Sequence, residues 1–400
     1  MPDPSPSPAR PVEPAVTDAL RPAAPGAVRL DGILSKRLQA CRENRVLAQD
    51  IGRVVRPFRD RTEGPNGFRC EYWGKWVTSA ALADRNRSDA TSQKVLRKAV
   101  DALLRTQTPD GCISTYDNEH QLGTWDVWGR KYVLLGLLAC AERTGEETAL
   151  DAARRLADYT IAQVAANNVN LAGTGWPDWE GLPPSSILEP MVLLHRRTGD
   201  GRYLAFARKI VEDWSRPTDL SPEGLRLVED ALAGRPVRNI GAPKAYEMMS
   251  CCEGLCELYR ATGDPDLLKA VLHIGSSILD TEIMAHGTGS NQECWRHGSR
   301  YQTVLLEQPG ESCVTVTWIK FCFQLLRLTG DPTWADAMEE ALHNALQHAD
   351  ASEVAVRLTQ YPDRLRLTVT DDGRGIVGGV EPSRFVAQGH YGLAGMRERA

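Results

Sequence analysis

The sequence has no run of about 18 apolar residues, so no transmembrane helix is expected. It also has little excess charge, because 47 Lys and Arg stand against 52 Asp and Glu. A net charge of −5 gives no reason to expect binding to nucleic acid or to a membrane surface. The first 27 residues hold eight prolines and no apolar core segment, which is unlike a secretory signal. We therefore predict that residues 1–27 are a disordered, proline-rich leader.

Paired CxxC motifs at zinc-ribbon spacing are also absent, although the chain has ten cysteines. Because no secretion signal is recognised, reduced thiols and a cytoplasmic location are the expectation. Most of these cysteines are expected to be buried structural thiols. The composition, 42% hydrophobic and 25% charged, is that of a globular protein.

A short phrase, Thr-Gly-Asp or Thr-Gly-Glu, recurs along the chain. Each copy follows one apolar helical run and precedes another; the copies begin at Thr144, Thr198, Thr262 and Thr329. Glycine can end a helix in the left-handed conformation, and the acidic residue after it can cap the next helix. Repeats of this length predict stacked helical hairpins.

Helical periodicity also appears at residues 32–56, 72–83 and 92–106, which gives about eleven helices before residue 350. A barrel of six hairpins needs one more. Alternating apolar and polar residues at 354–358 and 364–369 then predict two strands. The predicted fold is mainly α: an incomplete (α/α)6-type helical barrel followed by a small α+β fragment.

Ten tryptophans are present, and several lie in loops rich in glycine and proline. Such loops gather at one rim of a helical barrel, where ligands bind. Tryptophan faces can stack on sugar rings, so a carbohydrate partner is predicted, with binding residues Trp73, Trp76, Trp128 and Trp176. The alternative for any one of them is ordinary core packing.

The motif Glu311-Ser-Cys313 opens an apolar helix about twenty residues after Glu293 and a His-Gly-Thr-Gly-Ser segment. Residues 329–344 then read Thr-Gly-Asp followed by Glu-x-Ala-Leu-x-Asn. This order resembles glycoside hydrolase family 127, the β-L-arabinofuranosidase type, over residues 28–346. The resemblance implies retaining hydrolysis of a glycoside, with zinc bound by a glutamate and cysteines.

Carried onto this chain, the resemblance makes Glu293 the acid/base and makes Glu311 a catalytic-site residue that binds zinc together with Cys313. A metal would keep a thiolate ionised at neutral pH. The family's adjacent cysteine pair, which includes the nucleophile, has no counterpart here because no cysteine follows Cys322. The adjacent pair Cys251-Cys252 is interpreted as core packing. The set of zinc ligands is therefore expected to be incomplete, and hydrolysis is expected to be impaired. In the alternative interpretation, Glu311 is a helix-capping residue and Cys313 a buried thiol. The chain would then be a non-catalytic sugar-binding domain.

Three short motifs follow between residues 340 and 395: Glu-Ala-Leu-His-Asn, Asp-Asp-Gly-Arg-Gly and Gly-x-x-Gly-x-x-Gly. In this order they resemble a truncated ATP-binding domain of two-component sensor histidine kinases, over residues 336–400. The resemblance implies magnesium at Asn344 and ATP contacts from Glu340, Asn344, His348, Asp371, Gly373, Gly375, Gly389, Gly392 and Gly395. The helices that carry a phospho-acceptor histidine are missing, so kinase activity is not expected. An ATP-binding signalling fragment is the alternative function of the chain.

Residues 339–346 satisfy both patterns, since each family has a Glu…Ala-Leu-x-Asn helix at this point. The predicted organisation is a leader, residues 1–27, a barrel domain, residues 28–346, and a tail, residues 336–400, that shares its first helix with the barrel. A natural fusion or a sequence-assembly error at a short shared stretch would give such a junction.

Overall fold

The computed structural model of the chain describes residues 11–65, 67–175, 181–284, 287–301, 310–347, 354–360 and 365–371. Helices dominate this part, as predicted. Among these residues, no helix is both long enough and apolar enough to cross a membrane.

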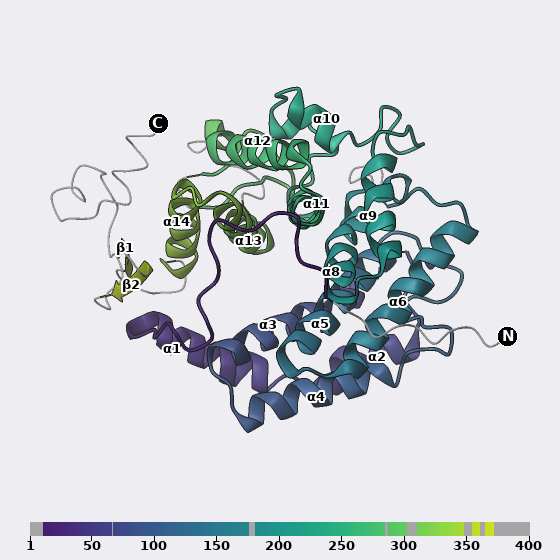
Figure 1. The fold of residues 1–400 in the computed structure, drawn as a ribbon, viewed down its shortest axis with the longest axis horizontal. Helices are drawn as coiled ribbons and strands as arrows, with labels where there is room; N and C mark the ends of the chain where they lie inside the picture. The colour runs from purple at the N-terminus through teal and green to yellow at the C-terminus, as the bar shows by residue number, and fades with distance from the viewer. Residues whose placement is uncertain are drawn as a thin grey trace.

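Five helices line the inside of an arc. They are α3 (Tyr72–Asn86), α5 (Asp126–Thr144), α8 (Leu188–Thr198), α11 (Ala245–Thr262) and α13 (Ser312–Thr329). Each packs beside the next in this order (Figure 1). α5 and α11 bury residues on nearly every face, as expected of helices enclosed by others.

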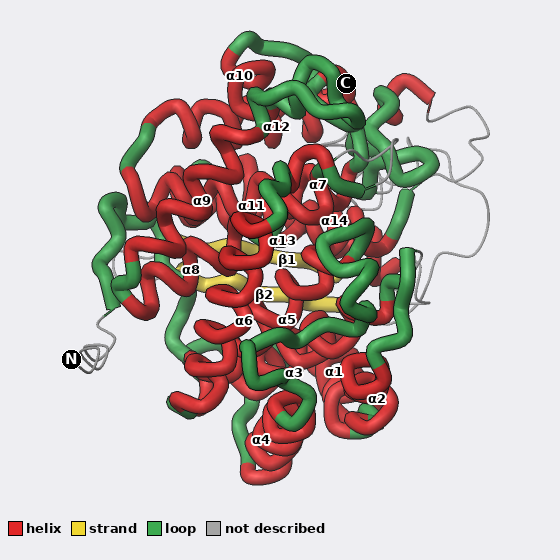
Figure 2. The backbone as a smooth tube through the Cα atoms, turned by 90° about the vertical axis from the view of Figure 1, so that its right-hand side faces the viewer, coloured by secondary structure: helices red, strands yellow, loops and turns green. Residues whose placement is uncertain are grey.

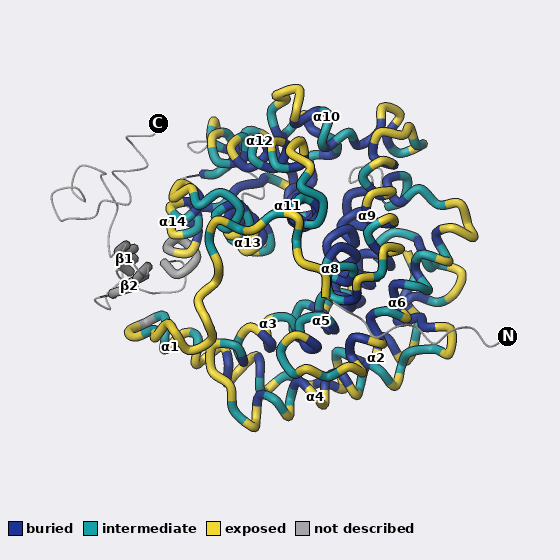
Figure 3. Tube along the Cα trace, viewed as in Figure 1, coloured by how far each residue is buried: buried dark blue, intermediate teal, exposed yellow. Residues whose placement is uncertain are grey.

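Five further helices lie outside the arc, and each packs on the inner helix before it. They are α4 (Ala90–Leu104), α6 (Glu147–Ala166), α9 (Gly201–Asp213), α12 (Pro265–Thr281) and α14 (Thr333–Gln347). Their inward faces are buried and their outward faces exposed, which is the pattern of amphipathic helices (Figure 3). The predicted incomplete (α/α) barrel is confirmed, with five inner–outer pairs among the described residues.

Shorter elements complete the described part. They are α1 (Gly32–Cys41), α2 (Ile51–Asp60), α7 (Leu182–Ser185), α10 (Leu227–Leu232), a π-helical turn (Arg42–Leu47) and the 3-10 turns Arg69–Glu71, Leu171–Gly173, Val237–Asn239 and Gly298–Tyr301. The single helix predicted over residues 32–56 is wrong. A new helix starts after Asp50, whose side chain caps it by accepting a hydrogen bond from the amide of Arg53 at 3.1 Å.

The repeated Thr-Gly-Asp turns have the predicted geometry. Their glycines are left-handed, with φ between 71° and 74°, at Gly145, Gly199, Gly263 and Gly330. In three of the turns the aspartate caps the following helix, at Asp200, Asp264 and Asp331. Glu146, at the N-cap position of α6, makes no such hydrogen bond and places its negative charge at the start of that helix instead. Each threonine hydroxyl also accepts the amide of the acidic residue, which the sequence analysis did not anticipate.

The predicted disorder of the leader is wrong for residues 11–27. Residues 12–20 of this segment cross the carboxyl ends of α8, α11 and α13, with bends at residues 15–16 and 19–20 (Figure 1). Backbone amides of Val12, Val16 and Leu20 donate to carbonyl oxygens of these helices. Hydrogen bonds to a preformed surface, which composition does not reveal, offset the entropy lost in ordering the segment.

The two predicted strands are confirmed. β1 (Val354–Gln360) and β2 (Leu365–Asp371) form an antiparallel pair in which Val354 lies opposite Asp371 and Gln360 opposite Leu365. Figure 2 shows the strands in yellow, against a fold that is otherwise helical where it is described.

Candidate active site

The amino ends of the five inner helices meet at one end of the arc, which we call the amino end. The Thr-Gly-Asp turns are at the opposite end, because every inner helix runs in the same direction and each outer helix returns. Charged and aromatic side chains from all five helices gather at or just inside the amino end: Glu71, Lys75, Trp128, Lys131, Tyr132, Glu189, Tyr246, Glu247, Glu311 and Cys313.

An aromatic cluster, Trp128, Tyr132 and Tyr246, forms the centre of this group. The ring of Trp128 lies edge-on to Tyr132 and Tyr246, at centroid distances of 5.1 Å in both cases. The two tyrosine hydroxyls share a hydrogen bond. The Nζ of Lys75 lies 4.9 Å from the Tyr246 ring and 2.7 Å from Glu71, which also accepts a hydrogen bond from Trp128 Nε1 at 2.6 Å. The cluster is therefore fixed by both ring contacts and charge.

The four predicted sugar-binding tryptophans have different surroundings. Trp73 is fully buried, and its Nε1 donates to the Ala99 carbonyl at 3.3 Å, so its predicted role is wrong and it is a core residue. Trp76 is half-buried against the same core. Trp128 lies in the aromatic cluster, although its ring is buried. Trp176 lies outside the described residues.

Glu293, the predicted acid/base, is on a loop tied to the start of α11. Its carbonyl accepts the amide of Ala245 at 2.9 Å, and the amide of Trp295 donates to Pro243 at 2.8 Å. Its carboxylate forms an ion pair with the buried Lys244. The ion pair therefore links the predicted acid/base to the start of α11.

The same loop is unusual in its backbone. Four residues other than glycine have φ between 50° and 76°, namely Ser290, Gln292, Glu293 and His297. Each such residue costs of order 1–2 kcal/mol, and this strain concentrates at functional sites. The buried Glu282 at the end of α12 holds the loop by accepting the amides of Arg296, His297 and Gly298 at 2.9–3.1 Å.

Glu311 and Cys313, the predicted zinc ligands, lie at the start of α13. Glu311 is the N-cap residue, but its side chain makes no capping hydrogen bond. Burial, followed by the charges of Glu311 and Glu247, raises the pKa of the Cys313 thiol to about 11. Without a metal or a cation beside it, the Cys313 side chain therefore favours the thiol over the nucleophilic thiolate at neutral pH.

The residues described do not fit a zinc ion. Within the described ranges, no group of three or more His, Cys, Asp or Glu side chains could hold a metal. Glu311 and Cys313 supply two donors, whereas protein zinc sites use three or four. Cys251 and Cys252 are fully buried in α11, and burial raises the pKa of both thiols, as expected of core residues.

Glu247, on the first turn of α11, is a carboxyl that the sequence analysis missed. It is buried, and its Oε2 has no hydrogen-bond partner among the described residues. Burial raises the pKa of this carboxyl, while the charge of Lys244 acts in the opposite direction. A buried carboxyl that favours its protonated form is suited to donate a proton. The sequence signal was a set of glutamates, Glu247, Glu253 and Glu257, within a mostly apolar helix.

A second charged group lies deeper between the inner helices. Lys131 is fully buried, its Nζ has no hydrogen-bond partner in the described part, and it lies 4.6 Å from the Trp128 ring. Burial lowers the pKa of Lys131 to about 8 and, with the charge of Glu253, raises the pKa of Glu189 to about 7. Lys320 binds Glu253 at 2.9 Å. Burial of these polar groups costs stability, so they are expected to serve ligand binding.

Glu189→Gln is expected to remove a pH dependence of stability. The ordinary pKa of glutamate is 4.5, and that of folded Glu189 is about 7, so only the folded chain keeps this proton between those values. The free energy of unfolding therefore falls as pH rises through this window, by about 1–3 kcal/mol. Urea denaturation at pH 5 and pH 7.5 measures the fall, which the variant should lose. The exposed Glu147→Gln is the control, and an unchanged fall in Glu189→Gln would contradict the assignment.

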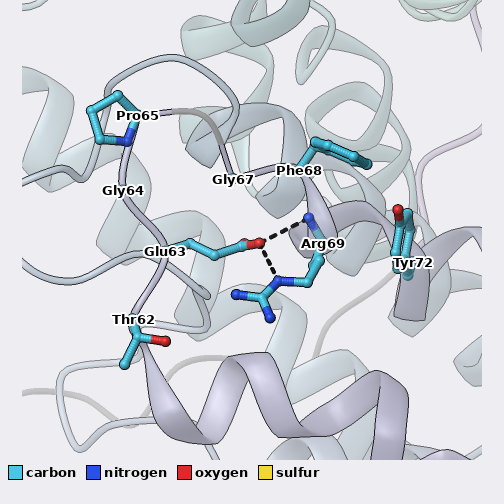
Figure 4. Close-up of a pocket in the computed structure, with 8 residues that line it drawn as sticks. All are labelled: Thr62, Glu63, Gly64, Pro65, Gly67, Phe68, Arg69 and Tyr72. Carbon is cyan, nitrogen blue, oxygen red and sulfur yellow. Dashed lines mark hydrogen bonds and ion pairs between the residues drawn. The ribbon is translucent and has the colours of Figure 1, made fainter.

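A cavity of about 590 Å³ lies beside the start of α3 (Figure 4). Its base is the buried Glu63, which accepts hydrogen bonds from the amide and Nε of Arg69 at 3.1 and 2.7 Å. Phe68 and Tyr72 expose their rings at its edge, 6.0 Å apart and nearly perpendicular. Exposed aromatic faces beside a cavity suit sugar rings better than the buried tryptophans do.

The predicted ATP-binding residues are described only in part. Glu340 and Asn344 lie one turn apart on α14, and Asp371 is the last residue of β2. The side chains of Asn344 and Asp371 lie outside the description, as do the residues His348, Gly373, Gly375, Gly389, Gly392 and Gly395. The described residues therefore leave this predicted site untested.

Two family models match the chain. The model of the "Beta-L-arabinofuranosidase, GH127 catalytic domain" matches residues 37–354. The model of the "Histidine kinase-, DNA gyrase B-, and HSP90-like ATPase" matches residues 331–400. Both predicted resemblances are confirmed, and the two matches overlap at α14, the helix in which the sequence patterns coincide.

Individual proteins agree with these matches. A non-reducing end beta-L-arabinofuranosidase from Bifidobacterium longum subsp. longum is 22% identical over 300 residues, which are 68% of this chain and 44% of that protein. The nitrate/nitrite sensor protein NarX of Escherichia coli is 44% identical over 61 residues, 15% of this chain and 9% of that protein. The chain thus spans less than half the length of either relative.

Solved structures show the same fold. A GH127 beta-L-arabinofuranosidase from Geobacillus stearothermophilus T6 has a TM-score of 0.59 at 17% identity, covering 81% of this chain and 56% of that one. Another GH127 beta-arabinofuranosidase has a TM-score of 0.58 at 20% identity, covering 82% and 54%. With most of its described helices inside the matched range, the chain belongs to the GH127 beta-L-arabinofuranosidase family.

Proposed function

We propose that the arc of helices binds β-L-arabinofuranosides or related sugars at its amino end, and that hydrolysis by this chain is impaired. The observation that carries the proposal is the convergence of buried carboxyls on the aromatic cluster in a member of this family. Glu247 provides a buried carboxyl with a raised pKa, and the half-buried Tyr246 provides apolar ring surface, with the buried Trp128 packed against it. Family membership and 22% identity to an arabinofuranosidase support the sugar class.

Hydrolysis is expected to be impaired because an activated nucleophile is missing from the described residues. A retaining glycosidase needs one group that protonates the leaving oxygen and another that attacks the sugar carbon. Cys313, on the first turn of α13, is a thiol at the amino end, and burial raises its pKa to about 11, which disfavours the attacking thiolate when no metal is bound. With two donors in place, we expect dialysed protein to hold less than one zinc ion per chain by elemental analysis. Binding should therefore persist while the covalent step is slow.

The test is turnover and binding of a chromogenic β-L-arabinofuranoside by the full chain. Loss of an active nucleophile lowers kcat by about 10⁴-fold or more, so we expect binding in calorimetry with little turnover. Glu293→Gln should lower the residual turnover a further 10²–10⁴-fold, roughly, with binding unchanged. Glu212→Gln, on the exposed face of α9, is the matched control. Absence of sugar binding would contradict the function, and turnover unaffected by Glu293→Gln would contradict the acid/base.

A second function is favoured by one observation, the 44% identity of the tail to a sensor kinase. We propose that residues 331–400 bind ATP with magnesium through Asn344 and Asp371. A fluorescent ATP analogue should then bind the full chain when magnesium is present. Binding that survives in both Asn344→Asp and Asp371→Asn would contradict this proposal.

A further inference from the structure

Residues 12–20, which we call the terminal strap, lie across the end of the arc opposite the candidate site. Three evenly spaced amides donate to carbonyl oxygens there: Val12 to Arg196 at 2.8 Å, Val16 to Arg260 at 3.2 Å, and Leu20 to Arg327 at 3.0 Å. Figure 1 shows this segment in dark purple, passing in front of α11 and α13 before it turns towards α1.

The spacing of the strap matches the spacing of the helices. Each acceptor arginine stands two residues before the threonine of a Thr-Gly-Asp turn, so the three carbonyls are equivalent positions in consecutive hairpins. Four residues span at most about 13 Å, and packed helices lie about 8–10 Å apart, so each step of four residues reaches the next helix even with the bends at residues 15–16 and 19–20. The match predicts one binding register.

Side chains of the strap alternate in burial. Pro14, Val16, Asp18 and Leu20 are half-buried, whereas Glu13, Ala15, Thr17 and Ala19 are exposed. Alternate side chains therefore face the helices along the strap, which bends at residues 15–16 and 19–20.

Asp18 gives the strap a charged anchor. Its carboxylate binds Arg260 Nε at 2.7 Å and Arg327 Nη2 at 2.6 Å, and so joins α11 to α13. The guanidinium of Arg260 is only 2% exposed and also binds Glu257 at 2.8 Å. A buried arginine depends on such partners, because an unpaired buried charge is costly.

The turn glycines leave room for the strap. A Cβ built on Gly263 would lie 3.7 Å from Val16 Cγ2, and one built on Gly330 would lie 3.5 Å from Ala19 Cβ. The strap therefore packs directly on two of the repeated turns. The strap precedes the residues matched by the GH127 family model, which begin at residue 37.

We propose that the carboxyl ends of α8, α11 and α13 form a binding site for a peptide segment that carries a carboxylate with an apolar side chain two residues away on each side, as Val16 and Leu20 flank Asp18. The ligand is the strap of the same molecule. Neighbour-to-neighbour packing is the rule in such arrays of hairpins, so one segment bound to three of them adds cooperativity that pairwise packing does not supply. The strap thus stabilises an arc of five inner helices.

Asp18→Asn tests the proposal in the full chain, with amide hydrogen exchange as the readout. The uncharged side chain cannot form ion pairs with Arg260 and Arg327, so hydrogen exchange at the amides of Val16 and Leu20 should become about tenfold faster. Glu13→Gln, an exposed change of the same kind in the same segment, is the matched control and should leave these rates unchanged. Equal rates in the Asp18→Asn variant and the unaltered chain would overturn the proposal.

A synthetic peptide of residues 10–24 supplies the second measurement. Added in excess to the Asp18→Asn chain, it should compete for the site and slow exchange at the last turns of α11 and α13. The same peptide carrying Asp18→Asn should bind at least about tenfold more weakly. No protection by the unaltered peptide would overturn the binding site. If the unaltered chain forms a dimer, and diluting it accelerates hydrogen exchange at the strap amides, then the strap binds a second copy of the chain. That result would overturn the assignment of the strap to its own molecule.

Discussion

Replacing Asp126 with alanine is expected to lower the free energy of unfolding by about 3–5 kcal/mol. The carboxylate binds Arg130 at 2.6 Å on the first turns of α5, and both side chains are fully buried. It also accepts the amide of Leu122 at 2.9 Å and the hydroxyl of Ser114. Removing it leaves a buried guanidinium without its charge partner. Urea denaturation with linear extrapolation measures the loss.

Two further variants show whether the loss in the free energy of unfolding comes from the burial of the ion pair or from ion pairing in general. Asp151 pairs with Arg154 at 3.0 Å on the surface of α6, so Asp151→Ala should cost about 1 kcal/mol or less. The double variant Asp126→Leu with Arg130→Met should recover much of the loss, because it leaves no charge unpaired. Equal losses for Asp126→Ala and Asp151→Ala would contradict this explanation.

Gly74→Ala should have the second large effect, because α3 and α5 touch at this glycine. An added Cβ would lie 2.0 Å from the carbonyl oxygen of Tyr132 and 2.8 Å from its Cβ. The backbones would have to separate, at a cost of about 1–3 kcal/mol or more. Because Lys75 and Tyr132 flank the contact, the aromatic cluster should change too. Urea denaturation reports the stability, and near-UV circular dichroism reports the cluster.

Gly201→Ala is the matched control. Gly201 is the first residue of α9, and a Cβ there would meet no atom within 4 Å. Alanine restricts the unfolded chain, so this variant should be equal to or slightly more stable than the unaltered protein. A similar loss at both glycines would show that helix contact at Gly74 is not the cause.

The hairpins were predictable from the sequence because each depends on neighbouring residues. The glycine and the acid of each turn lie within three positions, and the structure places them as expected at Gly199 and Asp200. The prediction of a disordered leader was wrong because the contacts of this segment depend on residues far away in the sequence. Its proline content suggested disorder, whereas Asp18 and the four-residue spacing of Val12, Val16 and Leu20 fit a surface formed far along the chain.

In the candidate site, too, contacts between residues distant in the sequence could not be predicted. Glu71 and Tyr246 stand 175 positions apart, yet both contact Trp128, and no local pattern announces that meeting. The number of tryptophans suggested contacts with sugar. A tryptophan ring such as Trp73 can contact a sugar only if it lies on a helix face that other helices do not cover, and Trp73 is buried. A better signal was charge inside apolar helices, as at Lys131 and Glu189.

The common direction of the inner helices gives that layer an electrical axis, which the returning outer helices oppose. Peptide dipoles add along each helix, so the amino ends of the inner helices carry partial positive charge and their carboxyl ends, beside the strap, carry partial negative charge. Glu71 and Glu311 stand at the amino ends, where negative charge is stabilised, whereas burial dominates at Glu247 and raises the pKa of its carboxyl. Arg196, Arg260 and Arg327, near the carboxyl ends, offset the exposed carbonyl groups. The inner layer thus favours acidic side chains at one end and basic side chains at the other, apart from the contacts that each side chain makes.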